Sequence, residues 1–224
     1  MENNFDINSY IYSKQFECPV CEEHFASNVV RESKMRMRSV EFDLHPICYP
    51  INPNFYDVII CPNCGYAAIK EYFNNITSKQ ADLILSEIAP KYKVQDYPAQ
   101  LTEDLAIKRY EQVLRCAMAK NAKDGEKAYI CMKLMWFYRL KGDVDNQKRF
   151  AEMTLKGFSS ALANESLPIM GLTDDTITYL LGALYMVLGD EKSAIRHLSE
   201  VVVSKTASDR LKDKARNLKD EMNV

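Results

Sequence analysis

The stretch YDVIICPNCGY, residues 56–66, joins a strand signal to a metal-binding turn. Its first half is aromatic and β-branched, which favours a strand. Its second half is a C-P-x-C turn that aims two thiolates at one point. Gly65, directly after the turn, supplies the positive φ that closes it. A second turn of this kind, CPVC, occupies residues 18–21. Two such turns in one chain predict a single tetrahedral metal site.

The two turns supply four candidate metal ligands: Cys18, Cys21, Cys61 and Cys64. Sulfur is a soft ligand that disfavours Mg²⁺ and Ca²⁺, and closed four-sulfur sites are structural, so we expect one structural Zn²⁺. Iron bound as in rubredoxin uses the same ligands, and the sequence leaves Zn²⁺ and Fe open. Disulfides, free thiols and a redox dithiol are weaker alternatives. The redox dithiol is disfavoured because a thioredoxin-like site needs a βαβ context that this sequence lacks.

Three other residues could contribute to a metal site: His24, His45 and Cys48. Because four sulfurs already fill a tetrahedron, we expect both histidines to lie at the surface or beside the ligands. Cys48 is expected to be a small apolar residue beneath the loop that carries it.

The composition is that of an ordinary globular chain of 224 residues, with 47% hydrophobic residues, 27% charged residues and a formal net charge of -2. That charge gives no general attraction to nucleic acid or to anionic membranes. Seven cysteines, four of them in paired turns, favour a reducing compartment over a secreted disulfide scaffold. The sequence shows neither a signal-peptide pattern nor an apolar run long enough for a membrane span. We therefore expect a cytoplasmic protein.

Strand and loop signals dominate the first 75 residues. Apolar and polar residues alternate over residues 35–42, which predicts a half-buried strand. Three prolines within residues 45–54 predict an irregular loop. Residues 56–60 predict the strand that leads into the second cysteine turn. Together these signals predict one small antiparallel sheet clamped by the metal.

Helix signals begin near residue 77, where the apolar period becomes 3.6 residues. A helix is expected to start at Asp124, and capping residues are expected at the other helix starts: Thr77 or Ser78, Thr102, Asp143, Thr173, Asp190 and Ser208. Short Gly-Asp turns at residues 142–143 and 189–190 indicate stacked antiparallel hairpins. The predicted fold class is α+β. A zinc-ribbon-like β domain, residues 1–75, is followed by an all-α helical-repeat domain, residues 76–224.

The second helical hairpin resembles a tetratricopeptide repeat at six positions: Leu181, Gly182, Tyr185, Gly189, Ala194 and Leu198. Its small residues would let two helices approach closely, and Gly189 would make the left-handed turn. The first hairpin resembles the repeat less, because Met135 and Gln147 replace the small residues. The spacing of 47 residues between the two turn glycines also exceeds the usual ~34.

The sequence carries no catalytic signature. No H-E-x-x-H, G-x-S-x-G, Walker or dinucleotide-binding pattern occurs, and the seven glycines provide no phosphate-cradling loop. A closed four-sulfur site also lacks the open coordination position that metal catalysis needs. We therefore expect a non-enzymatic interaction module. Its repeat-like hairpins would present a concave face over residues 128–138 and 178–185, where Tyr138 and Tyr185 are candidate contacts for a protein or peptide partner.

Nucleic acid is the alternative partner. A run of basic residues could form a face with nearby aromatic side chains: Arg31, Lys34, Arg36 and Arg38. Arg36 and Arg38, on the predicted strand, are the candidate contacts. Two glutamates interrupt the run, however, and alternating charges on a strand usually form its solvated face. The expected electrostatic attraction is therefore weak.

Three motifs precede the helical repeats: CPVC at residues 18–21, NPNFYDV at 52–58 and CPNCGYAA at 61–68. In this combination the chain resembles a bacterial zinc-ribbon plus helical-repeat family, the domain of unknown function 2225 family. The resemblance is close over the first 75 residues and looser over the helices, and it implies no activity. The leading hypothesis is thus a cytoplasmic zinc-binding adaptor whose helical repeats bind a protein or peptide.

Overall fold

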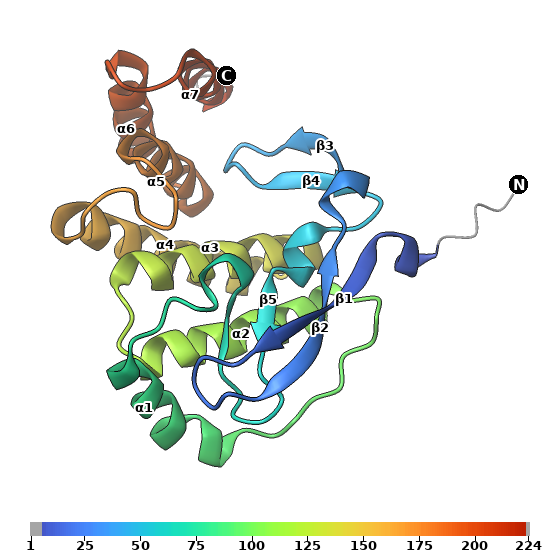
Figure 1. Cartoon of the computed structure of the whole chain (residues 1–224). Helices are drawn as coiled ribbons and strands as arrows, with labels where there is room; N and C mark the ends of the chain where they lie inside the picture. The colour runs from blue at the N-terminus through green and yellow to red at the C-terminus, as the bar shows by residue number, and fades with distance from the viewer. Residues whose placement is uncertain (1–5, 223–224) are drawn as a thin grey trace, which may run out of the picture. The chain divides into compact units, whose positions relative to one another are not determined.

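The structure, a computed structural model, describes residues 6–222 and divides into two compact units. Unit 1 comprises Met1–Ser39 and Ile47–Ala122, and unit 2 comprises Val40–Pro46 and Lys123–Val224. Figure 1 colours the strands blue to cyan and the later helices yellow to red. The predicted α+β class is confirmed, because short strand pairs precede seven α-helices in the described residues.

The strands form three separate two-stranded sheets instead of the single sheet that we predicted. The first pairs β1 (Ile11–Glu17) with β2 (His24–Val30) in antiparallel register from Ile11 opposite Val30 to Glu17 opposite His24. The others pair β3 (Arg36–Val40) with β4 (Pro46–Tyr49), and β5 (Val58–Ile60) with β6 (Ala67–Ile69). The cysteine turns follow β1 and β5, so each sheet beside the metal site is a hairpin closed by a cysteine turn.

The prediction of an irregular loop over residues 45–54 is wrong for its first half. β4 begins at Pro46 and pairs with β3. Proline is tolerated there because it occupies the first position of a strand, and both strands of a two-stranded sheet are edges. Residues 53–56 form a short 3-10 helix, η3, opened by Asn52, whose side chain accepts the backbone N–H of Asn54.

Unit 1 also contains the first two α-helices, α1 (Ser78–Glu87) and α2 (Glu103–Ala119). α2 packs against β5 and β6, and its Gln112 donates through Nε2 to the carbonyl of Gly65 at 2.8 Å. Phe73 completes the core, with its ring 5.2 Å from that of Tyr66 and 6.2 Å from that of Phe25. The predicted boundary at residue 75 therefore falls inside unit 1.

Unit 2 is built from five helices that follow one another in antiparallel hairpins. They are α3 (Asp124–Lys141), α4 (Val144–Asn164), α5 (Asp174–Leu188), α6 (Glu191–Val203) and α7 (Asp209–Met222). The predicted caps are confirmed, because the following side chains each accept a backbone N–H at a helix start: Thr77, Thr102, Asp143, Thr173, Asp190 and Ser208.

The two Gly-Asp turns of unit 2 share one geometry. Gly142 and Gly189 have φ of 76° and 83°, the left-handed conformation of a helix C-terminus. Each following aspartate, Asp143 or Asp190, uses its side chain to accept the N–H three residues later. The same Gly-Asp pair therefore ends one helix and starts the next in both hairpins.

Close helix contact in the two hairpins rests on different small residues. A Cβ added at Gly182 would lie 2.7 Å from Cγ of Leu198 and 3.3 Å from the carbonyl oxygen of Ala194, as the repeat pattern predicts for α5 and α6. In the first hairpin the close approach moves to Gly157, where an added Cβ would lie 2.8 Å from that of Ala128. The first hairpin thus keeps tight packing although it lacks the small residues of the repeat pattern.

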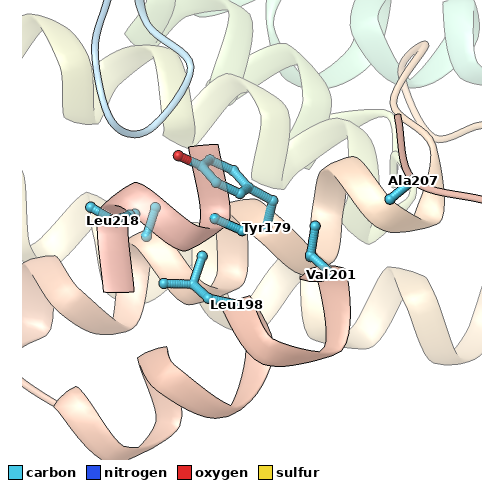
Figure 2. Packing of buried hydrophobic residues seen from close by; sticks show 7 residues of the cluster. Tyr179, Leu198, Val201, Ala207 and Leu218 are labelled. Atoms are coloured by element: carbon cyan, nitrogen blue, oxygen red, sulfur yellow. The ribbon is translucent and has the colours of Figure 1, made fainter. Parts of the chain in front are cut away.

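The core of unit 2 continues from α5 to α7 (Figure 2). Seven buried residues form this cluster: Tyr179, Ala183, Leu198, Val201, Ala207, Ala215 and Leu218. Phe42 and Leu44, from the loop at residues 41–45, pack against it, and Tyr179 donates its hydroxyl to the carbonyl of Phe42 at 2.6 Å. This loop is therefore part of the helical unit. No helix among residues 6–222 has the length and apolarity needed to cross a bilayer.

Candidate metal centre

The two cysteine turns converge on one point. The Sγ atoms of the four predicted ligands all lie within 4.8 Å of one another, and no other group of this kind occurs among the described residues. Cys18 and Cys64 are 3.7 Å apart at sulfur, and Cys21 and Cys61 are 3.6 Å apart. Zn–S bonds of about 2.3 Å in a tetrahedron require sulfur–sulfur edges of about 3.8 Å. The spacing fits a four-sulfur metal site.

The same distances exclude disulfides. A disulfide joins sulfurs at about 2.05 Å, and all four cysteines are free. Cys18 and Cys61 are fully buried, Cys64 is 3% exposed and Cys21 is half-buried. The four predicted ligands therefore lie together at one point, and this donor set could hold Zn²⁺ or Fe with no coordination position left over.

The backbone of the two turns explains why the sulfurs converge. Glu22 and Gly65, each directly after the second cysteine of its turn, donate their N–H groups to the carbonyls of Cys18 and Cys61 at 2.9 and 3.0 Å. Both have positive φ, 59° for Glu22 and 72° for Gly65. Glycine is required only in the second turn, where an added Cβ would lie 2.3 Å from Cγ of Tyr92.

Hydrogen bonds to sulfur affect the pKa values of the cysteines in this cluster in opposite directions. The N–H groups of Val20 and Cys21 bond to Cys18, and Asn63 donates through Nδ2 to the sulfur of Cys21 at 3.5 Å. Hydrogen bonds from Cys18 and Cys64 lower the pKa of Cys61 far below its ordinary value. Because Cys18 and Cys64 hold their protons in those bonds, their own pKa values are raised. Binding of a divalent ion to all four sulfurs would therefore release protons.

The other suggested ligands lie outside the cluster. His24 is exposed on β2, and Cys48 is half-buried on β4, where burial raises its pKa. The expectation that His45 lies at the surface or beside the ligands is wrong, because its side chain is fully buried in unit 2. Its ring stacks on Trp136 with centroids 4.6 Å apart, and its Nδ1 lies 2.7 Å from the carboxylate of Glu41.

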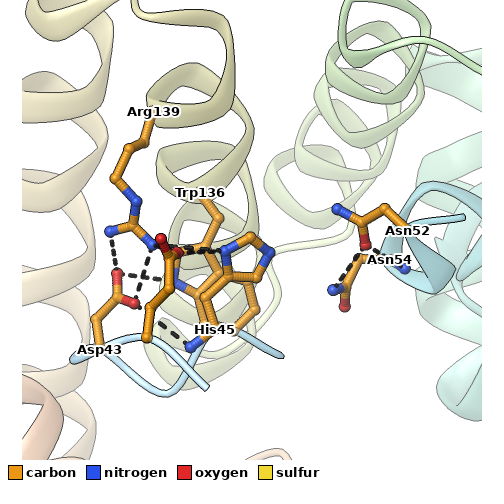
Figure 3. Close-up of polar contacts among 7 residues, drawn as sticks. Asp43, His45, Asn52, Asn54, Trp136 and Arg139 are labelled. Atoms are coloured by element: carbon orange, nitrogen blue, oxygen red, sulfur yellow. Dashed lines mark hydrogen bonds and ion pairs between the residues drawn. The ribbon is translucent and has the colours of Figure 1, made fainter. Parts of the chain in front are cut away.

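His45 belongs to a buried charged network that the sequence did not reveal (Figure 3). Arg139 binds both oxygens of Asp43, at 2.6 and 3.0 Å, and also pairs with Glu41. Trp136 donates its indole N–H to Asp43 at 2.9 Å. Burial lowers the pKa of Arg139, but the hydrogen bonds and charges of Asp43 and Glu41 outweigh burial, so the pKa is raised overall. These contacts fix the loop at residues 41–45 to α3.

The predicted partner contacts differ in how much surface they offer. Tyr138 is 9% exposed and stacks on Phe150 at 5.3 Å, so most of its ring lies in the core. Tyr185 is half-buried, with its ring 5.1 Å from that of His197. Arg36 and Arg38 are both exposed on β3.

Comparisons with known proteins give a family and no activity. An "Uncharacterized protein" of Borreliella burgdorferi is 21% identical over 136 residues, which cover 57% of this chain and 44% of that relative. The chain thus matches less than half the length of the relative. No solved structure matches the chain. The bacterial family described as "Uncharacterized protein conserved in bacteria (DUF2225)" matches residues 11–222, and its region contains all four cysteines. With nearly its whole length matched, the chain belongs to this bacterial family.

Proposed function

We propose that this chain is a non-catalytic cytoplasmic zinc-binding protein whose helical hairpins bind a protein or peptide partner. The observation that carries the proposal is the cluster of four sulfurs, all within 4.8 Å of one another and with two pairs 3.6 and 3.7 Å apart. An ion held there has four protein ligands and no position for a substrate, which supports a structural role.

Unit 2 supports the partner-binding half of the proposal. Its paired hairpins repeat one Gly-Asp turn geometry, as in stacked helical repeats that use an extended face for peptides. Several large apolar side chains of the first hairpin are exposed: Leu140 at 41%, Val144 at 56% and Met153 at 38%. Together with the half-buried Tyr185, they are the contacts that we assign to a partner.

Metal content tests the first half. Elemental analysis of the full chain, purified without chelator, is expected to find one Zn²⁺ per chain, and Cys61→Ser is expected to lower that ratio sharply. Lys79→Glu, an exposed change on α1, should leave the ratio unchanged. Iron in place of zinc, or equal metal content in both variants, would contradict the proposal.

Partner capture tests the second half. Full-length protein carrying Val144→Asp and Met153→Asp is compared with the unchanged chain and with Lys79→Glu, and proteins that co-purify are identified by mass spectrometry. A partner is expected to be recovered by the unchanged chain and by Lys79→Glu, and lost from the double variant. If every recovered protein is indifferent to the double variant, unit 2 does not use this surface.

A second candidate function, binding of single-stranded nucleic acid, is favoured by the β3–β4 hairpin. Arg36 and Arg38 make no ion pair among the described residues. Met37 and Tyr49 of the same hairpin are 58% and 65% exposed, so cations and a free aromatic ring occur together. A gel shift at low salt with a mixed-sequence oligonucleotide tests this function. If the hairpin binds nucleic acid, the unchanged chain should shift the oligonucleotide, and the double variant Arg36→Glu/Arg38→Glu should not.

A further inference from the structure

Arg109 of α2 is a buried cation with no acidic partner within residues 6–222. Its side chain is 6% exposed, and it makes no ion pair with any described residue. One nitrogen, Nη2, donates to the carbonyl of Val58, and the ring of Tyr97 lies 4.9 Å from the guanidinium carbon. A buried charge is costly unless an opposite charge and hydrogen bonds compensate it. Arg139 in unit 2, which binds two carboxylates, shows the usual solution.

The donors of Arg109 are largely unused by the protein. A guanidinium carries five N–H donors, and the described residues accept only the bond from Nη2. Nε is fully buried without an acceptor. Burial lowers the pKa of Arg109, and the groups that oppose this most are tyrosine hydroxyls, those of Tyr97, Tyr110, Tyr56 and Tyr92. The local environment therefore leaves the positive charge uncompensated.

Arg109 lines a cavity of about 380 Å³ within unit 1. Its lining includes residues 25–28 of β2 and residues 94–98, a segment without regular secondary structure. Tyr56 and Tyr92 add aromatic surface. A cavity of this size is within the range that holds small molecules. Asp96 is the only acidic residue in the lining, and its side chain is exposed.

A second cavity, of about 360 Å³, shares Tyr92, Gln95 and Tyr97 with the first. Four basic residues line it: Lys91, Lys93, Lys108 and Arg115. Its only acidic lining residue is Glu111, 3.9 Å from Arg115. The basic lining raises the local concentration of anions at the segment that forms a wall of both cavities.

We propose that the Arg109 cavity binds a small organic oxyanion, a molecule whose carboxylate or phosphate group pairs with the guanidinium of Arg109. The planar guanidinium matches two oxygens of either group, and the tyrosine walls accept the remainder of the molecule. The proposal is independent of the partner-binding role assigned to unit 2, because every lining residue lies in unit 1.

Isothermal titration of the zinc-loaded full chain tests the site, with inorganic phosphate, pyrophosphate, acetate and citrate as separate probes. Sodium chloride at matched ionic strength controls for general screening. At least one probe is expected to bind saturably at one site per chain. Preference for phosphate and pyrophosphate, or for acetate and citrate, distinguishes the two oxyanion groups.

Two variants locate the binding. Arg109→Gln keeps a polar side chain with an N–H donor and removes the charge, and Ala26→Trp adds a large side chain at an exposed lining residue of β2. Each is expected to weaken binding by about tenfold or more. Lys14→Trp is the control, since it places the same tryptophan side chain on the hairpin at an exposed residue outside the lining.

Two results would overturn the proposal. They are the absence of saturable binding for all four probes, or equal affinity in Ala26→Trp and Lys14→Trp. If Arg109→Gln does not fold, as judged by far-UV circular dichroism, the comparison of Ala26→Trp with Lys14→Trp decides the question.

Discussion

Unit 1 and unit 2 each use a polar cluster to hold a short non-helical segment, and the clusters differ in chemistry. In unit 1, four sulfurs from two turns meet around one point. In unit 2, Arg139 and Trp136 of α3 hold Asp43 in the loop at residues 41–45. The first cluster has the donor set to take an ion from solution, whereas the second is made wholly from side chains.

The difference in chemistry between the two clusters implies a different source of stability in each unit. Metal binding contributes its free energy directly to folding, so a small set of strands with a modest core can be held together. A buried ion pair must first offset the desolvation of both charges, and its net contribution is small as long as both partners remain. Removing the metal should therefore undo unit 1, whereas unit 2 should be sensitive to losing one partner of its pair.

Metal removal is expected to give the largest effect. A structural zinc site contributes on the order of 10 kcal/mol in small peptides, so a chelator or Cys61→Ser should unfold unit 1, including α1 and α2. The single tryptophan of the chain, Trp136, lies in unit 2 and reports on that unit alone. Far-UV ellipticity should fall in part while the tryptophan emission spectrum stays unchanged. A parallel change of both signals would show that the two units unfold together.

Loss of one partner in the buried pair is expected to rank second. Arg139→Met leaves the carboxylate of Asp43, which is 1% exposed, without its cation, and should lower the free energy of unfolding of unit 2 by about 3–5 kcal/mol. Denaturant titration followed by Trp136 fluorescence measures the change. Arg216→Met is the matched control, because its pair with Asp213 is exposed and should contribute below about 1 kcal/mol. Similar losses in the free energy of unfolding in both variants would mean that burial does not increase the cost of removing one partner of the pair.

The contrast between the clusters also explains what could be predicted from the sequence. A C-P-x-C turn is a local signal, and two of them in one chain are enough to predict that the four sulfurs converge. Helix starts and Gly-Asp turns are local as well, and they were confirmed. The network around Asp43 joins residues 93 and 96 positions apart. Neither spacing nor periodicity marks such a pair, so the sequence led us to expect His45 at the surface or beside the metal ligands.

The extent of unit 1 was missed for a related reason. The apolar period of α2 predicts a helix with one buried face but does not identify the core that this face covers. Gln112 contacts Gly65, and Arg109 contacts Val58, across 47 and 51 positions. Through these contacts α2 belongs with the strands and the cysteine turns. The helical pattern that starts at residue 77 therefore spans two compact units.

Glycine substitutions are expected to rank third and to separate the cysteine turns from the helical turns. Gly65→Ala would combine left-handed strain with a clash against Tyr92, costing about 2–4 kcal/mol and weakening zinc binding. Gly142→Ala has the same strain, but nothing lies within 4 Å of the added Cβ, so a cost of about 1–2 kcal/mol is expected. Thermal unfolding and zinc competition titrations measure both. Equal costs would mean that Tyr92 moves aside without loss.

The smallest expected effect is the pH dependence of unit 2. Burial lowers the pKa of His45 below its ordinary value, against the opposing effects of Glu41 and Asp43, so the unfolded chain takes up a proton more readily than the folded chain. Stability from a neutral His45 is therefore complete above the unfolded pKa of about 6.5 and declines as the pH falls below it. The slope cannot exceed about 1.4 kcal/mol per pH unit for one proton.

His45→Phe isolates this effect, since phenylalanine keeps a ring against Trp136 and cannot take up a proton. The free energy of unfolding of each protein is measured by Trp136 fluorescence from pH 7.5 down to pH 5. As the pH falls, the unchanged chain should lose more stability than His45→Phe. The carboxylates of Glu41 and Asp43 and the guanidinium of Arg139 are present in both proteins, so the difference reports on the imidazole together with its contacts to these groups. A difference that shifts in favour of the unchanged chain at low pH would show that Glu41 stabilises a protonated His45 more than burial disfavours it. The loop would then be held by a second ion pair, and the network would gain strength in acid where the cysteine cluster loses its metal.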